Sequence, residues 1–171
     1  MRINRVIECA LKKNNFSEII EFIAKKYPKN KFLIHEKKTL TFEEFNLKIN
    51  QTCNYFKKNK LNKNDIVALY LQNSIEFIIL YFACIRYGAI ASPIPYGLSD
   101  NQISYYLNIS KSNLLISSQK IKLKKKQVNF KNFAEFNSTV SQFEKYFHKT
   151  KFNKNKIGVY YFSSGTTDRP K

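Results

Sequence analysis

Short apolar runs of strand length alternate with segments of helical periodicity, and this alternation most constrains the fold of the chain. Residues 66–71, 89–93 and 113–117 carry no charged side chain and consist mainly of apolar residues, the pattern of strands buried on both faces of a sheet. The segments between them place apolar residues three and four positions apart, as amphipathic helices do. The sequence therefore predicts an α/β fold with a mainly parallel sheet flanked by helices.

Capping signals predict where the helices begin. Thr41 with Glu44 has the spacing of a capping box, and Ser99 with Gln102 has the same spacing. The helix predicted after Thr41 follows a short hairpin in residues 31–41. Two further amphipathic helices are predicted ahead of the hairpin, with apolar positions at Ile3, Val6, Ile7, Ala10 and Leu11 in the first and at Phe16, Ile19, Ile20 and Ile23 in the second.

The most apolar stretch of the chain is residues 77–85, bracketed by Glu76 and Arg86. A membrane-spanning helix needs about 20 apolar residues, so this stretch is too short to span a bilayer. Either Asn73 or Ser74 can cap a helix that starts just before it. We predict a buried helix of a globular protein.

The composition leaves few classes of protein open. The 171 residues suit one domain or part of a larger one, and 43% hydrophobic residues supply enough material for a core. The net charge of +18 raises the question of a nucleic-acid or anionic-membrane partner. Only four of the thirty basic residues are arginine, whereas bidentate recognition of phosphate and guanine favours arginine. We therefore expect no specific nucleic acid as a partner.

The cysteines indicate the cellular compartment. Cys9, Cys53 and Cys84 share no metal-ligand spacing, and an odd number so widely separated is not typical of a disulfide framework. Near the amino terminus, Glu8 and Lys12 interrupt any apolar stretch that could form the core of a signal peptide. We expect a reduced, cytoplasmic setting and no metal site.

Residues 119–156 differ in composition from the rest of the chain and are predicted to be a lysine-rich linker or insertion between residues 1–118 and 157–171. Residues 120–156 contain eleven lysines and two glutamates, a net charge of +9. Aromatic residues lie between the lysines, as they do in proteins that bind single-stranded nucleic acid. A helix or loop that packs its aromatic side chains inward and keeps its lysines in solvent explains the same pattern. A basic module that contacts nucleic acid or an anionic membrane is thus the alternative function.

A predicted strand in residues 157–162 leads directly into a loop rich in hydroxyl groups. Gly165 would let the backbone approach an anion closely, and Lys171 would add a positive charge. The loop is not a Walker A loop, because no Gly-Lys-Ser/Thr sequence closes it. The candidate phosphate-binding residues are Ser163, Ser164, Gly165, Thr166, Thr167 and Lys171.

Residues 162–171 resemble the signature phosphate loop of the AMP-forming, or adenylate-forming, superfamily. That superfamily includes acyl-CoA synthetases, the adenylation domains of peptide synthetases and luciferases. Segments upstream also resemble it, in the family's order: residues 40–42, 64–69, 73–77 and 88–93. The resemblance spans about residues 15–118 and 157–171 and implies the N-terminal part of the large α/β domain of the adenylate-forming fold, incomplete in this chain.

The resemblance also implies a function. A full-length enzyme of this superfamily uses ATP to convert a carboxylate to an acyl-adenylate and then transfers the acyl group to a thiol, such as that of CoA or a carrier protein. The loop's hydroxyl groups would hold the β and γ phosphates, Lys171 would offset charge in the leaving pyrophosphate, and Mg²⁺ is expected with the nucleotide. One departure from the family pattern is Asp168, which stands where the family has a second glycine.

The other departure is the end of the sequence at Lys171, where the family continues. From it we expect a fragment, a frameshifted product or half of a split enzyme, inactive alone and completed by a second polypeptide. On the same reasoning the strands in residues 66–71 and 157–162 are expected to lack neighbours, which would make the isolated chain prone to aggregate.

Overall fold

A parallel four-stranded sheet in the order β4-β3-β5-β6 forms the centre of the fold. Its strands are β3 (Ile66–Tyr70), β4 (Ile90–Pro93), β5 (Leu114–Ser117) and β6 (Gln127–Asn129), and all three neighbouring pairs are parallel. The computed structural model describes residues 12, 15–123, 127–129, 132–148, 155 and 157–162. The predicted α/β class with a mainly parallel sheet is confirmed.

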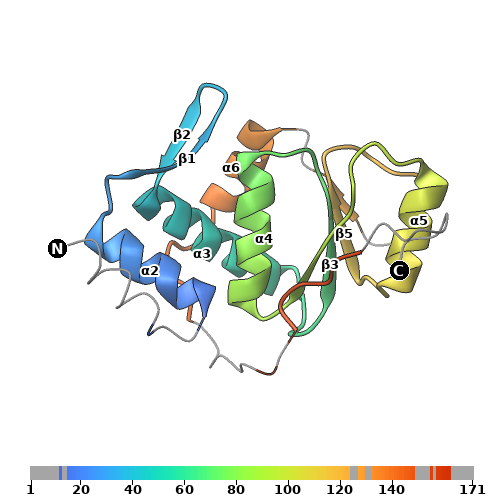
Figure 1. Ribbon diagram of the computed structural model, residues 1–171, viewed down its shortest axis with the longest axis horizontal. Coiled ribbons are helices and arrows are strands. Elements are labelled where there is room, and N and C mark those ends of the chain that lie inside the picture. Colours follow the sequence, from blue (N-terminus) through green and yellow to red (C-terminus); the bar gives the residue numbers. More distant parts are fainter. Residues whose placement is uncertain are drawn as a thin grey trace.

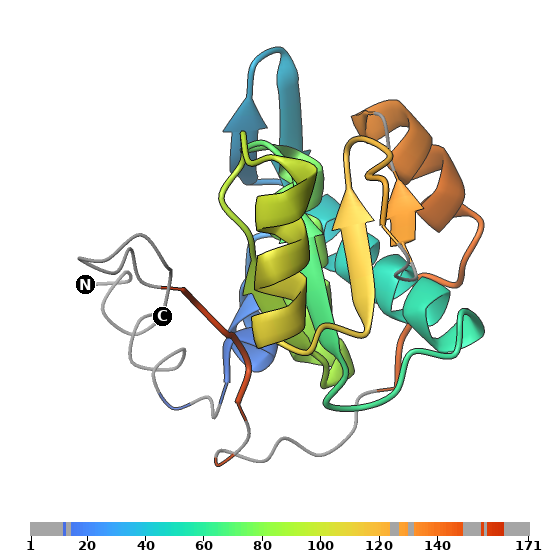
Figure 2. The same cartoon turned by 90° about the vertical axis from the view of Figure 1, so that its right-hand side faces the viewer.

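Helices cover both faces of this sheet (Figure 1). One face carries α2 (Phe16–Lys26), α3 (Phe42–Lys58), α4 (Ile75–Tyr87) and α6 (Phe133–Ser141). The opposite face carries α5 (Asp100–Ile109), which lies in front of the strands in Figure 2. Within the described chain, no helix is both long enough and apolar enough to cross a membrane.

Two hydrophobic cores result, one on each face, and β3 contributes to both. Val67 and Leu69 point into the larger core beneath α3 and α4, while Ala68 and Tyr70 point into the smaller core beneath α5. Successive side chains of a strand point to opposite faces, so a strand buried on both sides needs an unbroken apolar run. This is why residues 66–71 lack the polar alternation of a half-exposed strand.

The helix starts follow the capping signals. Both predicted capping boxes form: Thr41 with Glu44 caps α3, and Ser99 with Gln102 caps α5. Of the two residues that could cap α4, the structure uses Ser74, whose hydroxyl accepts a hydrogen bond from the backbone N–H of Phe77. The first predicted helix, in residues 3–11, lies outside the described residues.

The predicted hairpin is also present. Strands β1 (Lys31–His35) and β2 (Lys38–Thr41) pair antiparallel as a separate two-stranded sheet. In Figure 1 this hairpin projects beyond the amino-terminal end of α4. The apolar stretch 77–85 lies within α4, whose side chains pack between α3 and the sheet. The prediction of a buried helix there is confirmed.

The lysine-rich segment contributes β6, which was not predicted, and α6, which agrees with the alternative of a helix that packs aromatic side chains inward. Strand β6 extends the sheet beyond β5, and α6 packs against α3 and α4. Phe136, Val140 and Phe147 of this segment are buried in the larger core. Phe136 and Phe147 are therefore not available to stack on nucleic-acid bases.

Amide side chains of α3 hold the chain that follows α6. Asn50, Gln51 and Asn54 donate five hydrogen bonds of 2.8–3.2 Å to backbone carbonyl groups between residues 141 and 146. Carbonyl groups outside helices and sheets lack regular backbone partners, and these side-chain donors satisfy them. This part of the lysine-rich segment is thus fixed to the body of the protein.

The expectation that two strands lack neighbours is wrong for the first of them. Residues 66–71 contain β3, which pairs with β4 on one side and β5 on the other and is the best-connected strand of the sheet. Residues 157–162 have one described neighbour, because a single parallel bridge joins Val159 to Ala91 of β4. For residues 157–162, the expectation of a strand with few neighbours thus agrees with the described pairing.

Candidate functional site

The predicted phosphate loop, including Asp168, lies outside the described residues, so its candidate residues remain predictions: Ser163, Ser164, Gly165, Thr166, Thr167 and Lys171. The structure does place the segment that leads into this loop. The backbone N–H of Ala91 donates to the carbonyl of Gly158 (3.1 Å), and the N–H of Tyr160 donates to the carbonyl of Ala91 (2.8 Å). Residues 157–162 therefore run beside β4 and parallel to it.

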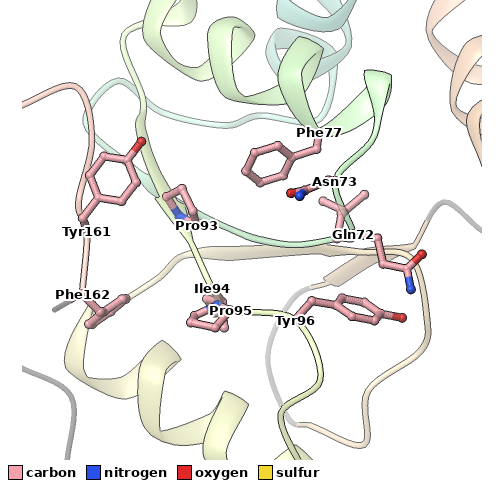
Figure 3. Close-up of a pocket in the computed structure, with 10 residues that line it drawn as sticks. Gln72, Asn73, Phe77, Pro93, Ile94, Pro95, Tyr96, Tyr161 and Phe162 are labelled. Atoms are coloured by element: carbon pink, nitrogen blue, oxygen red, sulfur yellow. The ribbon is translucent and has the colours of Figure 1, made fainter. Parts of the chain in front are cut away.

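The parallel arrangement brings the carboxyl ends of three extended segments to one edge of the sheet. The carboxyl ends of β3, β4 and residues 157–162 all face the same way, and open α/β sheets bind ligands just outside the carboxyl ends of their strands. At this edge lies a pocket of about 560 Å³ (Figure 3). Its lining residues are Leu71, Gln72, Asn73, Phe77, Pro93, Ile94, Pro95, Tyr96, Tyr161 and Phe162.

The lining is mainly apolar and aromatic, with a few polar groups at the rim. Gln72 and Asn73 are exposed and carry amide groups that can both donate and accept hydrogen bonds. None of the ten lining residues is a carboxylate, lysine, histidine or cysteine. This composition suits the binding of a ligand with an apolar or planar part, and it supplies no general acid or base other than tyrosine.

Tyr70 supports the wall of the pocket that contains Tyr96. Its ring is buried and stacks on Tyr96, with the ring centroids 5.1 Å apart. Its hydroxyl group donates to the carbonyl of Leu98 (3.1 Å) and accepts from the backbone N–H of Gly97 (3.2 Å). Gly97 has a φ of 92°, a left-handed conformation that glycine adopts without strain, and this lets the loop after β4 turn back towards Tyr70.

The other wall is formed where residues 157–162 end. The hydroxyl groups of Tyr161 and Tyr81 of α4 form a hydrogen bond of 2.9 Å. Burial of Tyr81 and its hydrogen bond with Tyr161 raise the pKa of Tyr81, so its hydroxyl group stays protonated at neutral pH. On the opposite side Phe162 packs edge-on against Tyr106 of α5, with the ring centroids 4.6 Å apart.

A second, smaller pocket of about 180 Å³ lies at the same edge, between the β1–β2 turn and the start of α4. Its lining is polar and includes His35, Glu36, Lys38 and Glu76. Within the described ranges, no three His, Cys, Asp or Glu side chains gather as ligands for a metal ion. The mixed charges of this pocket do not favour either an anion or a cation.

The two described cysteines are part of the core. Cys53 and Cys84 are fully buried free thiols, as expected for Cys84 on an apolar helix, whereas Cys9 lies outside the described residues. Burial raises the pKa of Cys53 to about 12 and raises that of Cys84 as well. Because the thiolate is the nucleophile, neither thiol is suited to covalent catalysis at neutral pH.

The sequence analysis missed most of the pocket. It considered Asn73 only as a helix cap and assigned no role to Tyr96, which lies in the wall. The usable signal was the position of these residues, just after the predicted strands 66–71 and 89–93. In a parallel sheet those positions meet at one edge, and that edge is where ligands bind.

A sequence model of the AMP-binding enzyme family matches residues 20–171, which is most of the chain and includes the predicted phosphate loop. The chain belongs to this family. The resemblance noted in the sequence is thereby confirmed, and the order of its elements is that of an AMP-binding enzyme.

Characterised relatives include enzymes of two kinds. Gramicidin S synthase 1 of Brevibacillus brevis is 26% identical over 162 residues, which cover 90% of this chain and 14% of that protein. The chloroplastic/glyoxysomal acetyl-coenzyme A synthetase of Arabidopsis thaliana is 31% identical over 93 residues, 54% of this chain and 12% of that protein. The chain thus spans about one seventh or less of the length of these two relatives.

Solved structures share the fold. The N-terminal domain of FACL13 from Mycobacterium tuberculosis has a TM-score of 0.82 at 20% identity, with 92% of this chain and 43% of that chain covered. The fatty acyl-adenylate ligase from L. pneumophila, solved with acyl adenylate and pyrophosphate, has a TM-score of 0.76 at 19% identity and covers 95% of this chain and 30% of that one. The fold described above is that of the N-terminal domains of adenylate-forming enzymes.

Proposed function

We propose that this chain supplies the N-terminal part, including the phosphate loop, of an ATP-dependent ligase that activates a carboxylic acid. The observation that carries the proposal is the course of residues 157–162. They end at the carboxyl edge of the parallel sheet beside the larger pocket, so the predicted loop begins where this class of sheet binds ligands. The family match, which extends through residue 171, supports the same assignment.

In the proposed reaction, a carboxylate oxygen attacks the α-phosphorus of ATP. The bond between the α-phosphorus and the bridging oxygen breaks, and pyrophosphate leaves as acyl-AMP forms. The acyl group then passes to a thiol of CoA or of a carrier protein, which releases AMP. One of the relatives is named as an acetyl-coenzyme A synthetase and another as gramicidin S synthase 1, so we leave the thiol acceptor as either CoA or a carrier protein.

The chain's own contribution is to bind and orient the nucleotide. Hydroxyl groups of Ser163, Ser164, Thr166 and Thr167 would donate to the β and γ phosphates, and Lys171 would stabilise negative charge on the leaving pyrophosphate. Mg²⁺ would enter with the nucleotide, since this ion usually keeps several waters and binds through substrate phosphates. We assign the protein to the cytoplasm, where its thiols remain reduced.

The complete reaction is assigned to an assembly longer than these 171 residues, either one polypeptide or this chain with a second one. The two relatives named above are several times longer than this chain. We therefore expect the chain alone to give no pyrophosphate exchange above background with fatty, aryl or amino acids.

Calorimetric titration with MgATP tests the proposal. Lys171→Ala should weaken binding about tenfold to a hundredfold, because a charge-assisted hydrogen bond contributes roughly 1.5–3 kcal/mol. The matched control is Lys120→Ala, which removes the same charge from an exposed position in the lysine-rich segment. The control should bind MgATP within about twofold of the wild type.

Two results would count against the proposal. Absence of MgATP binding by the wild type would refute the proposal that this chain binds the nucleotide. Equal weakening by both substitutions, with a steep dependence on salt concentration, would indicate attraction by net charge alone and would favour the basic binding module.

A further inference from the structure

Residues 157–162 are held to the sheet by few backbone contacts. Two hydrogen bonds, both at Ala91, join the segment to β4, and no further backbone bond involves Tyr161 or Phe162 among the described residues. The segment is also at the edge of the described sheet, where Ile157 is 61% and Tyr161 is 66% exposed. Backbone pairing alone leaves its last two residues free to move away from β4.

Side chains from two helices compensate for this. The hydroxyl of Tyr161 bonds to that of Tyr81 on α4, and the ring of Phe162 packs edge-on against Tyr106 on α5. Figure 3 shows the ring of Tyr161 and, below it, the ring of Phe162, which lies beside α5. Because neighbouring residues of an extended strand point to opposite faces, the two contacts restrain the strand end from both faces of the sheet.

We propose that Tyr81 and Tyr106 are positioning residues that hold the strand end at Tyr161 and Phe162 and so fix where the following loop begins. The consequence for nucleotide affinity rests on the proposed function, whereas the effect on the strand end does not. The two contacts join α4 and α5 to residues that both line the larger pocket. A displaced strand end would change that wall and the start of the predicted phosphate loop together.

Amide hydrogen exchange, measured by NMR on the full chain, tests the effect on the strand end. The reporter is the N–H of Tyr160, which bonds to Ala91, and the reference is the N–H of Ile94, which bonds to Leu69 of β3. Tyr81→Phe removes only a hydroxyl group and should speed exchange at Tyr160 two- to threefold, since the bond is exposed and at the weak end of its range. Exchange at Ile94 should not change.

The second contact depends on a ring rather than a hydroxyl group, which gives a sharper pair of variants. Tyr106→Phe keeps the ring and should behave as the wild type, whereas Tyr106→Leu should speed exchange at Tyr160 about two- to twelvefold. Tyr146→Leu, which removes a more exposed ring that lies outside α5, is the matched control and should leave exchange at Tyr160 unchanged. The double variant Tyr81→Phe/Tyr161→Phe should match Tyr81→Phe alone.

Unchanged exchange at Tyr160 in both Tyr81→Phe and Tyr106→Leu would overturn the proposal, and so would equal acceleration at Tyr160 and Ile94, which would indicate general destabilisation. Titration of the same variants with MgATP then tests the functional consequence. Affinity should fall in step with the exchange at Tyr160, and unchanged affinity would overturn the link to the loop. If the wild type does not bind MgATP, the proposed function fails, while the exchange data still decide the role of Tyr81 and Tyr106.

Discussion

Replacing Arg86 with methionine should destabilise the protein strongly, because its guanidinium group joins three helices in a buried position. Arg86 lies in the last turn of α4, and its side chain is fully buried. Nε donates to the hydroxyl of Ser17 in α2 (2.8 Å), and Nη1 donates to Oδ1 of Asn50 in α3 (2.7 Å). A third partner, Glu21, lies 3.7 Å from Nη2 and is 23% exposed.

The expected magnitude follows from these contacts. A hydrogen bond to a charged group contributes roughly 1.5–3 kcal/mol, and Arg86 makes two short ones to side chains. The more exposed pair with Glu21 adds about 1 kcal/mol or less. Burial lowers the pKa of Arg86, and relief of this desolvation offsets part of the loss. Methionine preserves most of the side-chain volume, so we expect a net loss of about 2–4 kcal/mol.

Urea denaturation monitored by circular dichroism measures this loss. The midpoint should fall while the slope of unfolding free energy against urea stays the same, and the melting temperature should drop by roughly 4–16 °C. Lys58→Met removes the same charge from an exposed position at the end of α3 and should change the stability by less than about 0.5 kcal/mol. If Arg86→Met stays within about 1 kcal/mol of the wild type, the guanidinium network does not stabilise the helix junction.

Three further predictions concern single groups. Burial raises the pKa of Cys53 from 9.0 to about 12, so the stability it contributes is complete below pH 9 and falls as the pH rises towards 12. In urea titrations near pH ~10.5, Cys53→Ala should lose about 2 kcal/mol less stability than the wild type, while the contribution of Cys84, whose pKa burial also raises, stays in both. Ser92→Ala should leave the stability unchanged or raise it by up to about 1 kcal/mol, because the buried Ser92 hydroxyl has no hydrogen-bond partner in the described part of the chain; a loss of stability would reveal one. Asp168→Gly should tighten MgATP binding, because it removes a carboxylate that would repel the phosphates and restores the glycine that the family has at this position. An unchanged or weaker affinity in calorimetry would refute this repulsion.

Features encoded by neighbouring residues could be predicted from the sequence. The capping boxes at Thr41 and Ser99 depend on residues three positions apart, and both formed as predicted. The strand β3 was predictable because burial on both faces requires an uncharged run, and residues 66–71 supply one. Several short motifs, in the order in which the family has them, indicated the family, and the family model confirms it.

Features that depend on distant residues could not be predicted in the same way. In the lysine-rich segment, Phe136 and Val140 reach the core although many lysines surround them in the sequence, so the local pattern did not reveal β6. Arg86 flanks the apolar stretch of α4 and was treated as its boundary, yet its partners on α2 and α3 keep it buried. The pair of Tyr81 and Tyr161 joins residues eighty positions apart.

The candidate site also combines features encoded by neighbouring residues with features that depend on distant ones. The positions just after two predicted strands were a usable signal for this edge of the sheet, but the wall that Tyr161 and Phe162 form exists because residues 157–162 come to lie beside β4. That pairing follows from tertiary packing and not from any local signal. The role of the phosphate loop, in contrast, is a prediction from its residues and its family.

The central claim, that the chain binds the phosphates of ATP where residues 157–162 end, is tested most directly by titrating MgATP into the ¹⁵N-labelled chain and following the amide resonances. The account predicts that the largest shift changes fall on residues 161–171 and on Gln72, Asn73 and Tyr96 of the larger pocket. It is contradicted if the changes fall mainly on the lysine-rich residues 120–148, or if saturating MgATP moves no resonance at the carboxyl edge of the sheet.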